Sequence, residues 1–187
     1  MWKVFLICPL FFISSCIPRM YVSDFEDRPC KINPPDIKEL RFDGAYYRID
    51  EYKNLLAYFF YDNCIQRRLG ADSNHYNRFS IAQSIQKIID DFNAAAKKND
   101  QYFGDGGYSV TSSQINLQSI WYLPQFAWAT FTYKGTIIND STIVFTEYRL
   151  PKEKVYRNDS TYYHFVKTNK PDSLKGNRWK DKKWYWR

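Results

Sequence analysis

The stretch Leu55-Leu56-Ala57-Tyr58-Phe59-Phe60-Tyr61-Asp62-Asn63 decides the fold. Its first seven residues form a dense apolar and aromatic run, which is typical of a β-strand. Asp62 and Asn63 both tolerate positive φ and suit a tight hairpin turn, after which Cys64-Ile65 begins a returning strand. The stretch therefore predicts a β-hairpin within a mainly β domain.

Strand patterns and turn signals alternate on both sides of this hairpin. Residues 45–49 follow the turn signal Asp43-Gly44, and Asp105-Gly106-Gly107 reopens the β region further along the chain. In residues 126–133 both faces are substantially apolar, which fits a strand buried on both sides or one wall of a filled barrel. The other expected strands are residues 108–110, 114–122, 142–150 and 161–166, with turns at Thr111-Ser112-Ser113, Lys134-Gly135 and Asn139-Asp140. About eight or nine strands joined by tight turns predict a small antiparallel barrel.

One amphipathic helix is expected between the strands, over residues 80–98. Its apolar residues recur at helical spacing and form a single stripe: Ile81, Ile85, Ile88, Ile89 and Phe92. Ser80 and Gln83 fit a capping box, and Lys97 and Lys98 suit the negative end of the helix dipole. We expect the stripe to pack against the sheet, and the alternative is a lid over a cavity.

Several short motifs within residues 39–174 carry a family resemblance. They are Leu40-Arg41-Phe42-Asp43-Gly44-Ala45-Tyr46-Tyr47, Phe59-Phe60-Tyr61-Asp62-Asn63, Gly107-Tyr108-Ser109-Val110 with Gln114-Ile115-Asn116-Leu117, Gly135-Thr136-Ile137-Ile138-Asn139-Asp140-Ser141-Thr142, and Tyr163-His164-Phe165 before Lys170-Pro171-Asp172-Ser173. Together they resemble the uncharacterised lipocalin-like lipoproteins of Bacteroidota. The resemblance implies a small antiparallel, lipocalin-like barrel, and it implies no known ligand or catalytic residue. One departure is Cys64, which stands where such hairpins commonly carry glycine.

The N-terminus has the pattern of a secretory signal. Lys3 supplies a positive charge, residues 4–13 form a short apolar run, and the small residues Ser14-Ser15 precede Cys16. The run is shorter than the roughly 20 residues that a membrane-spanning helix needs. Because Ile13-Ser14-Ser15-Cys16 also resembles a bacterial lipobox, we expect residues 1–15 to be a lipoprotein signal peptide and Cys16 to carry acyl chains such as palmitate. The alternative is a plain secretory signal that is cleaved elsewhere.

This assignment predicts a lipid-anchored protein of the cell envelope at the outer membrane. The periplasm-facing leaflet is preferred over the outer one. Residues 16–38 are rich in proline and are expected to form a tether that lifts the domain at residues 39–174 off the membrane. The membrane, contacted through the N-terminal lipid, is therefore the first expected partner.

The positive charge of the chain is concentrated at the C-terminus. The formal net charge is +7, and residues 175–187 hold six basic residues against one acidic residue. Because this basicity belongs to a short tail of an exported chain, we exclude nucleic acid as a partner. Trp184 and Trp186 stand at alternate positions, so residues 175–187 are expected to be the strand that closes the barrel. The alternative is contact of this basic aromatic tail with an anionic membrane surface.

Cysteine and histidine usage indicates little reaction chemistry. After removal of the signal peptide and lipidation of Cys16, Cys30 and Cys64 remain as a candidate disulfide or as two packed thiols. The two histidines, His75 and His164, have no flanking ligands at metal spacing, so no metal site is expected. We find no phosphate-binding loop, nucleophile elbow or paired carboxylates. The sequence therefore predicts no enzymatic activity and no cofactor.

Three tripeptides look like the short O-glycosylation motif of Bacteroidota. They are Asp140-Ser141-Thr142, Asp159-Ser160-Thr161 and Asp172-Ser173-Leu174, which makes Ser141, Ser160 and Ser173 candidate modification sites. The alternative is ordinary turn chemistry, in which Asp and Ser bond to nearby backbone groups.

The leading functional hypothesis is a non-enzymatic binding module for a small apolar or aromatic ligand. The alternative is an accessory or structural subunit that binds another envelope protein, with a filled barrel and no ligand. An apolar cavity of about 300 Å³ or more would favour the ligand. A packed interior with a large exposed aromatic patch would favour the protein partner.

Overall fold

The computed structural model describes residues 19–21, 40–72, 79–97, 105–123, 127–149, 159–172, 174, 177 and 179–182. Its elements in chain order are β1 (Arg19–Tyr21), β2 (Gly44–Ile49), β3 (Leu55–Phe60), β4 (Ile65–Ala71), α2 (Ile81–Lys97), β5 (Asp105–Thr111), β6 (Gln114–Leu123), β7 (Ala127–Asn139), β8 (Thr142–Arg149) and β9 (Thr161–Lys167).

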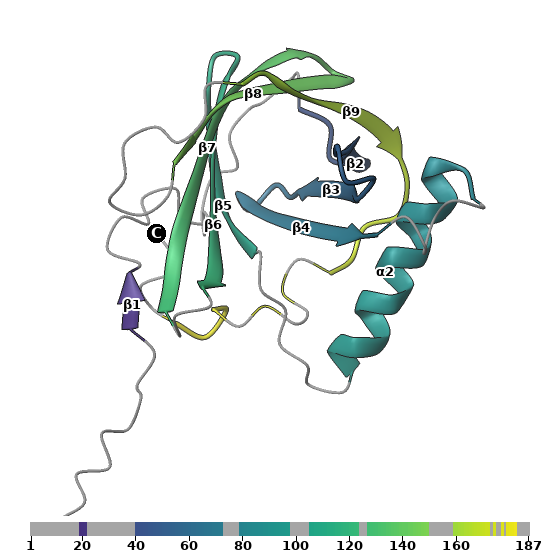
Figure 1. The fold of residues 1–187 in the computed structure, drawn as a ribbon, viewed down its shortest axis with the longest axis horizontal. Coiled ribbons are helices and arrows are strands. Elements are labelled where there is room, and N and C mark those ends of the chain that lie inside the picture. The colour runs from purple at the N-terminus through teal and green to yellow at the C-terminus, as the bar shows by residue number, and fades with distance from the viewer. Residues whose placement is uncertain are drawn as a thin grey trace, which may run out of the picture.

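Strands β2 to β9 form a closed antiparallel barrel (Figure 1). Each strand pairs with the next one along the chain, and β9 returns to pair with β2, where Phe165 lies opposite Tyr46. This confirms the predicted fold class, a mainly β antiparallel barrel with one helix inserted, here between β4 and β5. Strand β1 lies outside the closed ring and pairs in parallel with the start of β7. The segment expected to be a tether therefore includes a short strand.

Strand β3 is buried on both faces, which explains why its sequence is so uniformly apolar. Alternate side chains belong to the cluster inside the barrel: Leu56, Tyr58 and Phe60. The others belong to the cluster beneath α2: Leu55, Ala57 and Phe59. All six are less than a tenth exposed. Because full burial of a large apolar side chain contributes roughly 1.5–3 kcal/mol, β3 anchors both layers of the domain.

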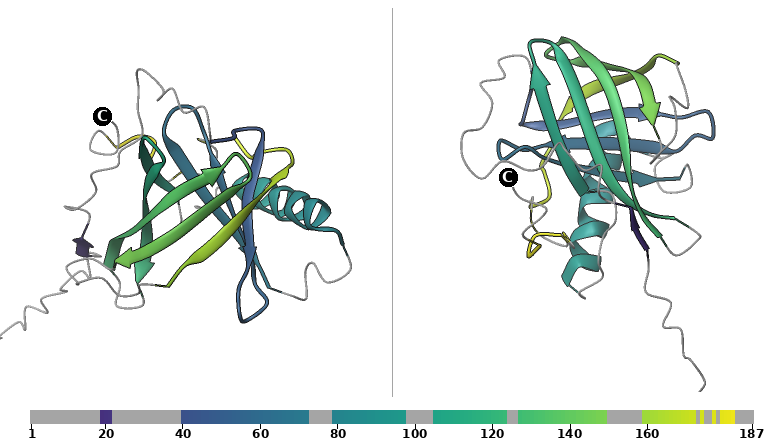
Figure 2. Two further views of the ribbon diagram at one scale, coloured as in Figure 1. Left: turned by 90° about the horizontal axis from the view of Figure 1, so that it is seen from above. Right: turned by 90° about the vertical axis from the view of Figure 1, so that its left-hand side faces the viewer.

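Helix α2 packs on the outer face of the barrel (Figure 2). The predicted stripe is confirmed, since Ile85, Ile88, Ile89 and Phe92 are buried against the sheet rather than over a cavity. The predicted capping box is also present: the Ser80 N–H donates to Gln83 Oε1 at 3.0 Å, and the Gln83 N–H donates to Ser80 Oγ at 3.3 Å. Within the described part of the chain, no helix combines the length and the hydropathy needed to cross a membrane.

The expected turn at Lys134-Gly135 is wrong. Strand β7 continues through these residues as one strand of 13 residues. The register of its pairing with β8 shifts here instead, because Lys134 lies opposite Glu147 while Gly135 lies opposite Phe145. Thr146 is therefore the extra residue of a β-bulge in β8. The glycine marks a bulge rather than a chain reversal.

The hairpin between β3 and β4 keeps its expected turn although cysteine replaces the usual glycine. The Cys64 N–H donates to the Tyr61 carbonyl at 3.1 Å, and the Tyr61 N–H donates to the Ile65 carbonyl at 3.0 Å. Cys64 adopts φ 59°, the left-handed conformation that glycine ordinarily supplies at this position. Cys64 is disulfide-bonded. Its partner lies outside the described residues, so the pairing with Cys30 stays a prediction.

The barrel closes without the C-terminal tail. Strand β9 completes the ring by pairing with β2, which corrects the expectation that residues 175–187 supply the closing strand. Tyr163 and Phe165 of β9 supply aromatic side chains to the barrel interior at this closure. In the tail, residues 179–181 form a turn and the Trp179 side chain is buried. Residues 183–187 lie outside the described part of the chain.

Candidate functional site

Aromatic rings pack the interior of the barrel. Ring centroids are 5.2 Å apart for Tyr58 and Tyr163, 5.1 Å for Phe60 and Tyr108, and 5.5 Å for Phe145 and Tyr163. These separations are typical of tilted and edge-to-face aromatic pairs. We call this group the aromatic core, and its members are Tyr46, Tyr58, Phe60, Tyr108, Phe145 and Tyr163. Where these rings meet, the interior is filled by side chains and is not hollow.

Hydrogen bonds from core tyrosines seal one end of the barrel, which we call the closed end. The Tyr46 hydroxyl donates to the Asp140 carbonyl in the β7–β8 turn at 3.0 Å. The Tyr108 hydroxyl donates to the Tyr61 carbonyl beside the β3–β4 turn at 2.7 Å. Burial raises the pKa of Tyr46 and of Tyr108, so both hydroxyls stay protonated and keep donating.

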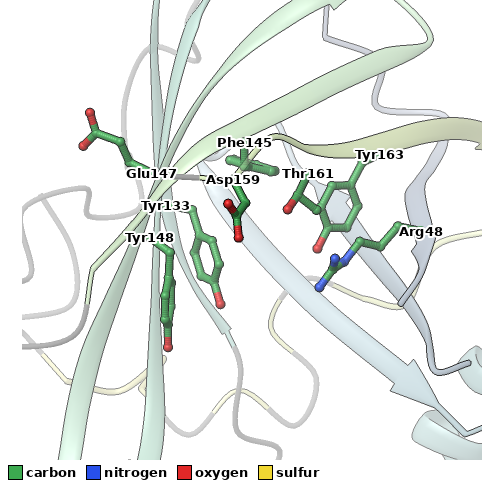
Figure 3. Close-up of a pocket in the computed structure, with 8 residues that line it drawn as sticks. All are labelled: Arg48, Tyr133, Phe145, Glu147, Tyr148, Asp159, Thr161 and Tyr163. Carbon is green, nitrogen blue, oxygen red and sulfur yellow. The ribbon is translucent and has the colours of Figure 1, made fainter. Parts of the chain in front are cut away.

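A pocket of about 240 Å³ lies away from the closed end, at what we call the open end (Figure 3). Its lining comes from β2, β7, β8, β9 and one residue before β9: Arg48, Tyr133, Phe145, Glu147, Tyr148, Asp159, Thr161 and Tyr163. The pocket forms where β8 extends beyond the end of its pairing with β9. Among the described residues, β8 pairs with β9 only as far as Phe145, and residues 147–149 pair with β7 alone.

The bulge in β8 brings Tyr148 into this pocket. In a regular strand, Phe145 and Tyr148 would point to opposite faces. Because Thr146 is an extra residue, Tyr148 lies on the pocket side, and its ring centroid is 4.9 Å from that of Tyr133. Gly135 permits the close strand approach at the bulge, since a Cβ there would clash with a backbone carbonyl of β8.

Arg48 places a positive charge at the pocket, and Asp50, which follows β2, interacts with it electrostatically without forming an ion pair. Arg48 forms no ion pair with a described residue, and its guanidinium carbon lies 5.6 Å from the ring centroid of Tyr163. Its Nε is buried without a hydrogen-bond partner among the described residues. Glu147 points away from the pocket in Figure 3 and pairs with Arg149 at 3.3 Å. Asp159 is exposed at the rim.

Neutral tyrosine hydroxyls lie on the inner side of the pocket. Burial raises the pKa of Tyr163, an effect that the nearby Arg48 and Arg68 oppose. Burial also raises the pKa of Tyr58, whose ring packs directly behind those of Tyr163 and Phe145. The pocket therefore combines aromatic walls, hydroxyl donors and one cation.

Three of the predicted site residues, Cys16, Cys30 and Ser173, lie outside the described residues. Their predicted lipidation, disulfide and glycosylation stay predictions. His75 also lies outside the described part, and His164 is exposed on β9, where its ring centroid is 6.4 Å from that of Tyr47. Among the side chains that the structure describes, no three His, Cys, Asp or Glu residues gather as a metal site.

The other two candidate serines are both exposed. Ser141 lies in the β7–β8 turn at the closed end, where its hydroxyl donates to Asn139 Oδ1 at 2.8 Å. Ser160 lies at the open end between the pocket residues Asp159 and Thr161. Both are accessible to modification, and their glycosylation stays a prediction.

Sequence reasoning missed the pocket residues Arg48, Tyr133 and Tyr148. For Arg48 there was a usable signal, because it stands two residues after the inward-facing Tyr46 in a strand. Tyr148 gave no such signal, since the bulge at Thr146 reverses the face to which it points.

Comparison of the chain with protein-family models, with curated proteins and with solved structures finds no match. The geometry of the open end is therefore the basis on which a function is proposed.

Proposed function

We propose that this protein is a non-enzymatic binding module, tethered to the outer membrane of the cell envelope, that takes a small aromatic or apolar ligand. The observation that supports this most is the open-end pocket, which Tyr133, Phe145, Tyr148 and Tyr163 surround at one end of a packed barrel. Ligand sites in proteins are commonly concave and aromatic, with a few polar groups that fix orientation.

The size of the pocket limits the ligand. Its volume of about 240 Å³ lies below the range of about 300–1,000 Å³ that is usual for drug-sized ligands. It is also below the size that would by itself favour a ligand over a protein partner. The pocket therefore suits a single ring with a short substituent, and it is too small for a long acyl chain.

The alternative function is an accessory subunit for another envelope protein. A packed aromatic core fits this function as well, but binding a protein partner also needs an exposed apolar surface. The exposed large apolar side chains of the described residues are distributed over several strands and loops: Ile49, Tyr52, Phe79, Ile138, Tyr162 and Leu174. Apolar residues scattered singly are ordinary for a protein surface, so we prefer the ligand-binding function.

The membrane tether rests on the sequence of the signal and the lipobox. We expect Cys16→Ala to move the protein from the membrane fraction to the soluble fraction, or to leave an unprocessed precursor, because Cys16 is the residue expected to carry the anchoring acyl chains. Cell fractionation with immunoblotting measures this. Cys30→Ala is the matched control and should remain in the membrane fraction. Unchanged membrane association of Cys16→Ala would contradict the tether.

The ligand function is tested by filling the pocket. In a Cys16→Ala background, we expect Thr161→Phe to abolish binding of a small aromatic probe, 3-phenylpropionamide, because the new ring occupies the pocket. Tyr162→Phe, at the exposed neighbouring position of β9, should bind as the parent does. Ligand-observed NMR measures the affinity, for which a Kd on the order of 1 mM or tighter is expected of a fragment-sized ligand.

Near-UV circular dichroism checks that each variant is folded. If Thr161→Phe does not fold, Tyr148→Ala removes one wall of the pocket and should weaken binding instead. Binding that survives in a folded pocket variant would overturn the assignment of this site. If neither 3-phenylpropionamide nor 3-phenylpropionate binds the parent, the ligand-binding function is contradicted and the accessory-subunit function is supported instead.

A further inference from the structure

We propose that the ligand of the open-end pocket carries a carboxylate and that Arg48 binds this group. The inference rests on the proposed function, because it specifies the chemistry of the ligand in the same pocket. The juxtaposition that carries it is a guanidinium that forms no ion pair with a described residue, beside an aromatic wall, at a pocket large enough for one ring.

The fold directs Arg48 into the open end of the barrel. Strand alternation places it on the same face of β2 as Tyr46, which belongs to the aromatic core. Figure 3 shows the Arg48 side chain extending into the pocket near Tyr163. The backbone thus holds a cation at the edge of an apolar interior, where a charge without a counter-ion is costly.

Other arginines of this barrel have carboxylate partners. Arg67 pairs with Asp105, Arg149 pairs with Glu147, and Arg41 pairs with Asp43. Arg48 forms no such ion pair with a described residue, because the nearby Asp50 carboxylate accepts hydrogen bonds from Asn54 instead, and the buried Arg48 Nε has no hydrogen-bond partner among the described residues. A guanidinium presents donors in a planar fork that matches a carboxylate in a bidentate arrangement. A ligand carboxylate would supply the acceptor that Arg48 Nε does not find among the described residues.

The surrounding charges favour a compact monoanion. Asp159 at the rim would repel a dianion such as a phosphate ester more strongly than a monoanion, and Arg48 is the one cation among the described lining residues. The Tyr163 hydroxyl lines the same wall and stays protonated, since burial raises its pKa. It can therefore donate a second hydrogen bond to a carboxylate. An aromatic ring would then rest against Tyr133 and Tyr148.

Two probes of nearly the same shape separate charge recognition from ring recognition. In the Cys16→Ala background, 3-phenylpropionate should bind about tenfold more tightly than 3-phenylpropionamide, because charge-assisted hydrogen bonds contribute more than neutral ones. Arg48→Gln should abolish this preference, because the carboxylate then loses its counter-ion in the pocket. Arg41→Gln is the control, because Arg41 belongs to the stretch beside the closed end, where its backbone N–H donates to the Tyr46 hydroxyl. It should retain the preference.

The outcomes distinguish this inference from the proposed function. Equal affinity of the parent for both probes would overturn the carboxylate assignment and leave the aromatic pocket intact as a site. A preference that persists in Arg48→Gln would overturn the role of Arg48. If Arg48→Gln fails to fold, Arg48→Lys keeps the charge, loses the planar fork, and should reduce the preference without abolishing it.

Asp159→Asn should raise the affinity for the carboxylate severalfold, and a decrease would contradict recognition of a simple monoanion.

Discussion

Arg67→Met is expected to lower the free energy of unfolding by about 3–5 kcal/mol. Arg67 has no exposed side-chain surface, and its partner Asp105 is 1% exposed. Nε and Nη2 of Arg67 donate to the two carboxylate oxygens of Asp105 at 2.6 and 2.8 Å. Methionine fills a similar volume but leaves Asp105 as a buried acid without its counter-ion. Urea unfolding followed by circular dichroism measures the loss.

The large effect also reflects the number of elements that Arg67 joins. Besides Asp105 on β5, it donates through Nη1 to the Asp172 carbonyl at 2.6 Å, in the segment after β9. Its guanidinium carbon lies 4.6 Å from the ring centroid of Phe92 on α2. One side chain of β4 therefore connects a neighbouring strand, the helix and the segment that follows the last strand of the barrel.

Two controls separate the lost ion pair from the lost side chain. The double variant Arg67→Met with Asp105→Leu should recover much of the stability, because removing both charges leaves no unpaired group buried. Lys87→Met breaks the exposed pair with Asp91, whose atoms are 3.3 Å apart, and should cost no more than about 0.5 kcal/mol. A cost of less than about 1 kcal/mol for the single Arg67 substitution would contradict the structural role of this pair.

The parts of the fold that sequence could predict are those that local patterns determine. The run at residues 55–61, the stripe on α2 and the capping box at Ser80 each depend on spacing within one element, and each is confirmed. Lys134-Gly135 was misassigned because a glycine in a strand and a glycine in a turn look alike locally. Only the pairing with β8 distinguishes them, and that pairing is a property of the folded barrel.

The candidate site was harder to predict because its geometry depends on residues far apart in the chain. Tyr148 faces the pocket only because Thr146 forms a bulge. Arg48 would usually be assigned to solvent, and only the folded barrel shows that it lines the pocket and forms no ion pair with a described residue. The same limit applies to Arg67, whose partner Asp105 is 38 residues away. A charged residue inside an apolar strand gives no sign of which distant group neutralises it.

Ile85→Asp is expected to unfold the domain. Ile85 is fully buried between α2 and the outer face of the barrel, in the cluster that contains Leu55, Phe59 and Leu69. Removing a large apolar side chain from such a site costs about 2–5 kcal/mol, and an unpaired buried carboxylate adds a further penalty. The sum approaches the whole stability of a typical domain, about 5–15 kcal/mol. Near-UV circular dichroism should therefore show the loss of fixed tertiary packing.

Three milder substitutions in α2 or at its N-terminal cap give a scale against which the effect of Ile85→Asp can be compared. Ile85→Ala removes the side chain without adding a charge, so it should cost about 2–5 kcal/mol and remain measurable by urea unfolding. Ser80→Ala removes the cap and should cost about 1 kcal/mol. Ala94→Asp adds the same charge at an exposed position and should cost less than about 1 kcal/mol. If Ile85→Ala were as mild as Ala94→Asp, α2 would contribute little to the barrel, and its apolar stripe would need another explanation.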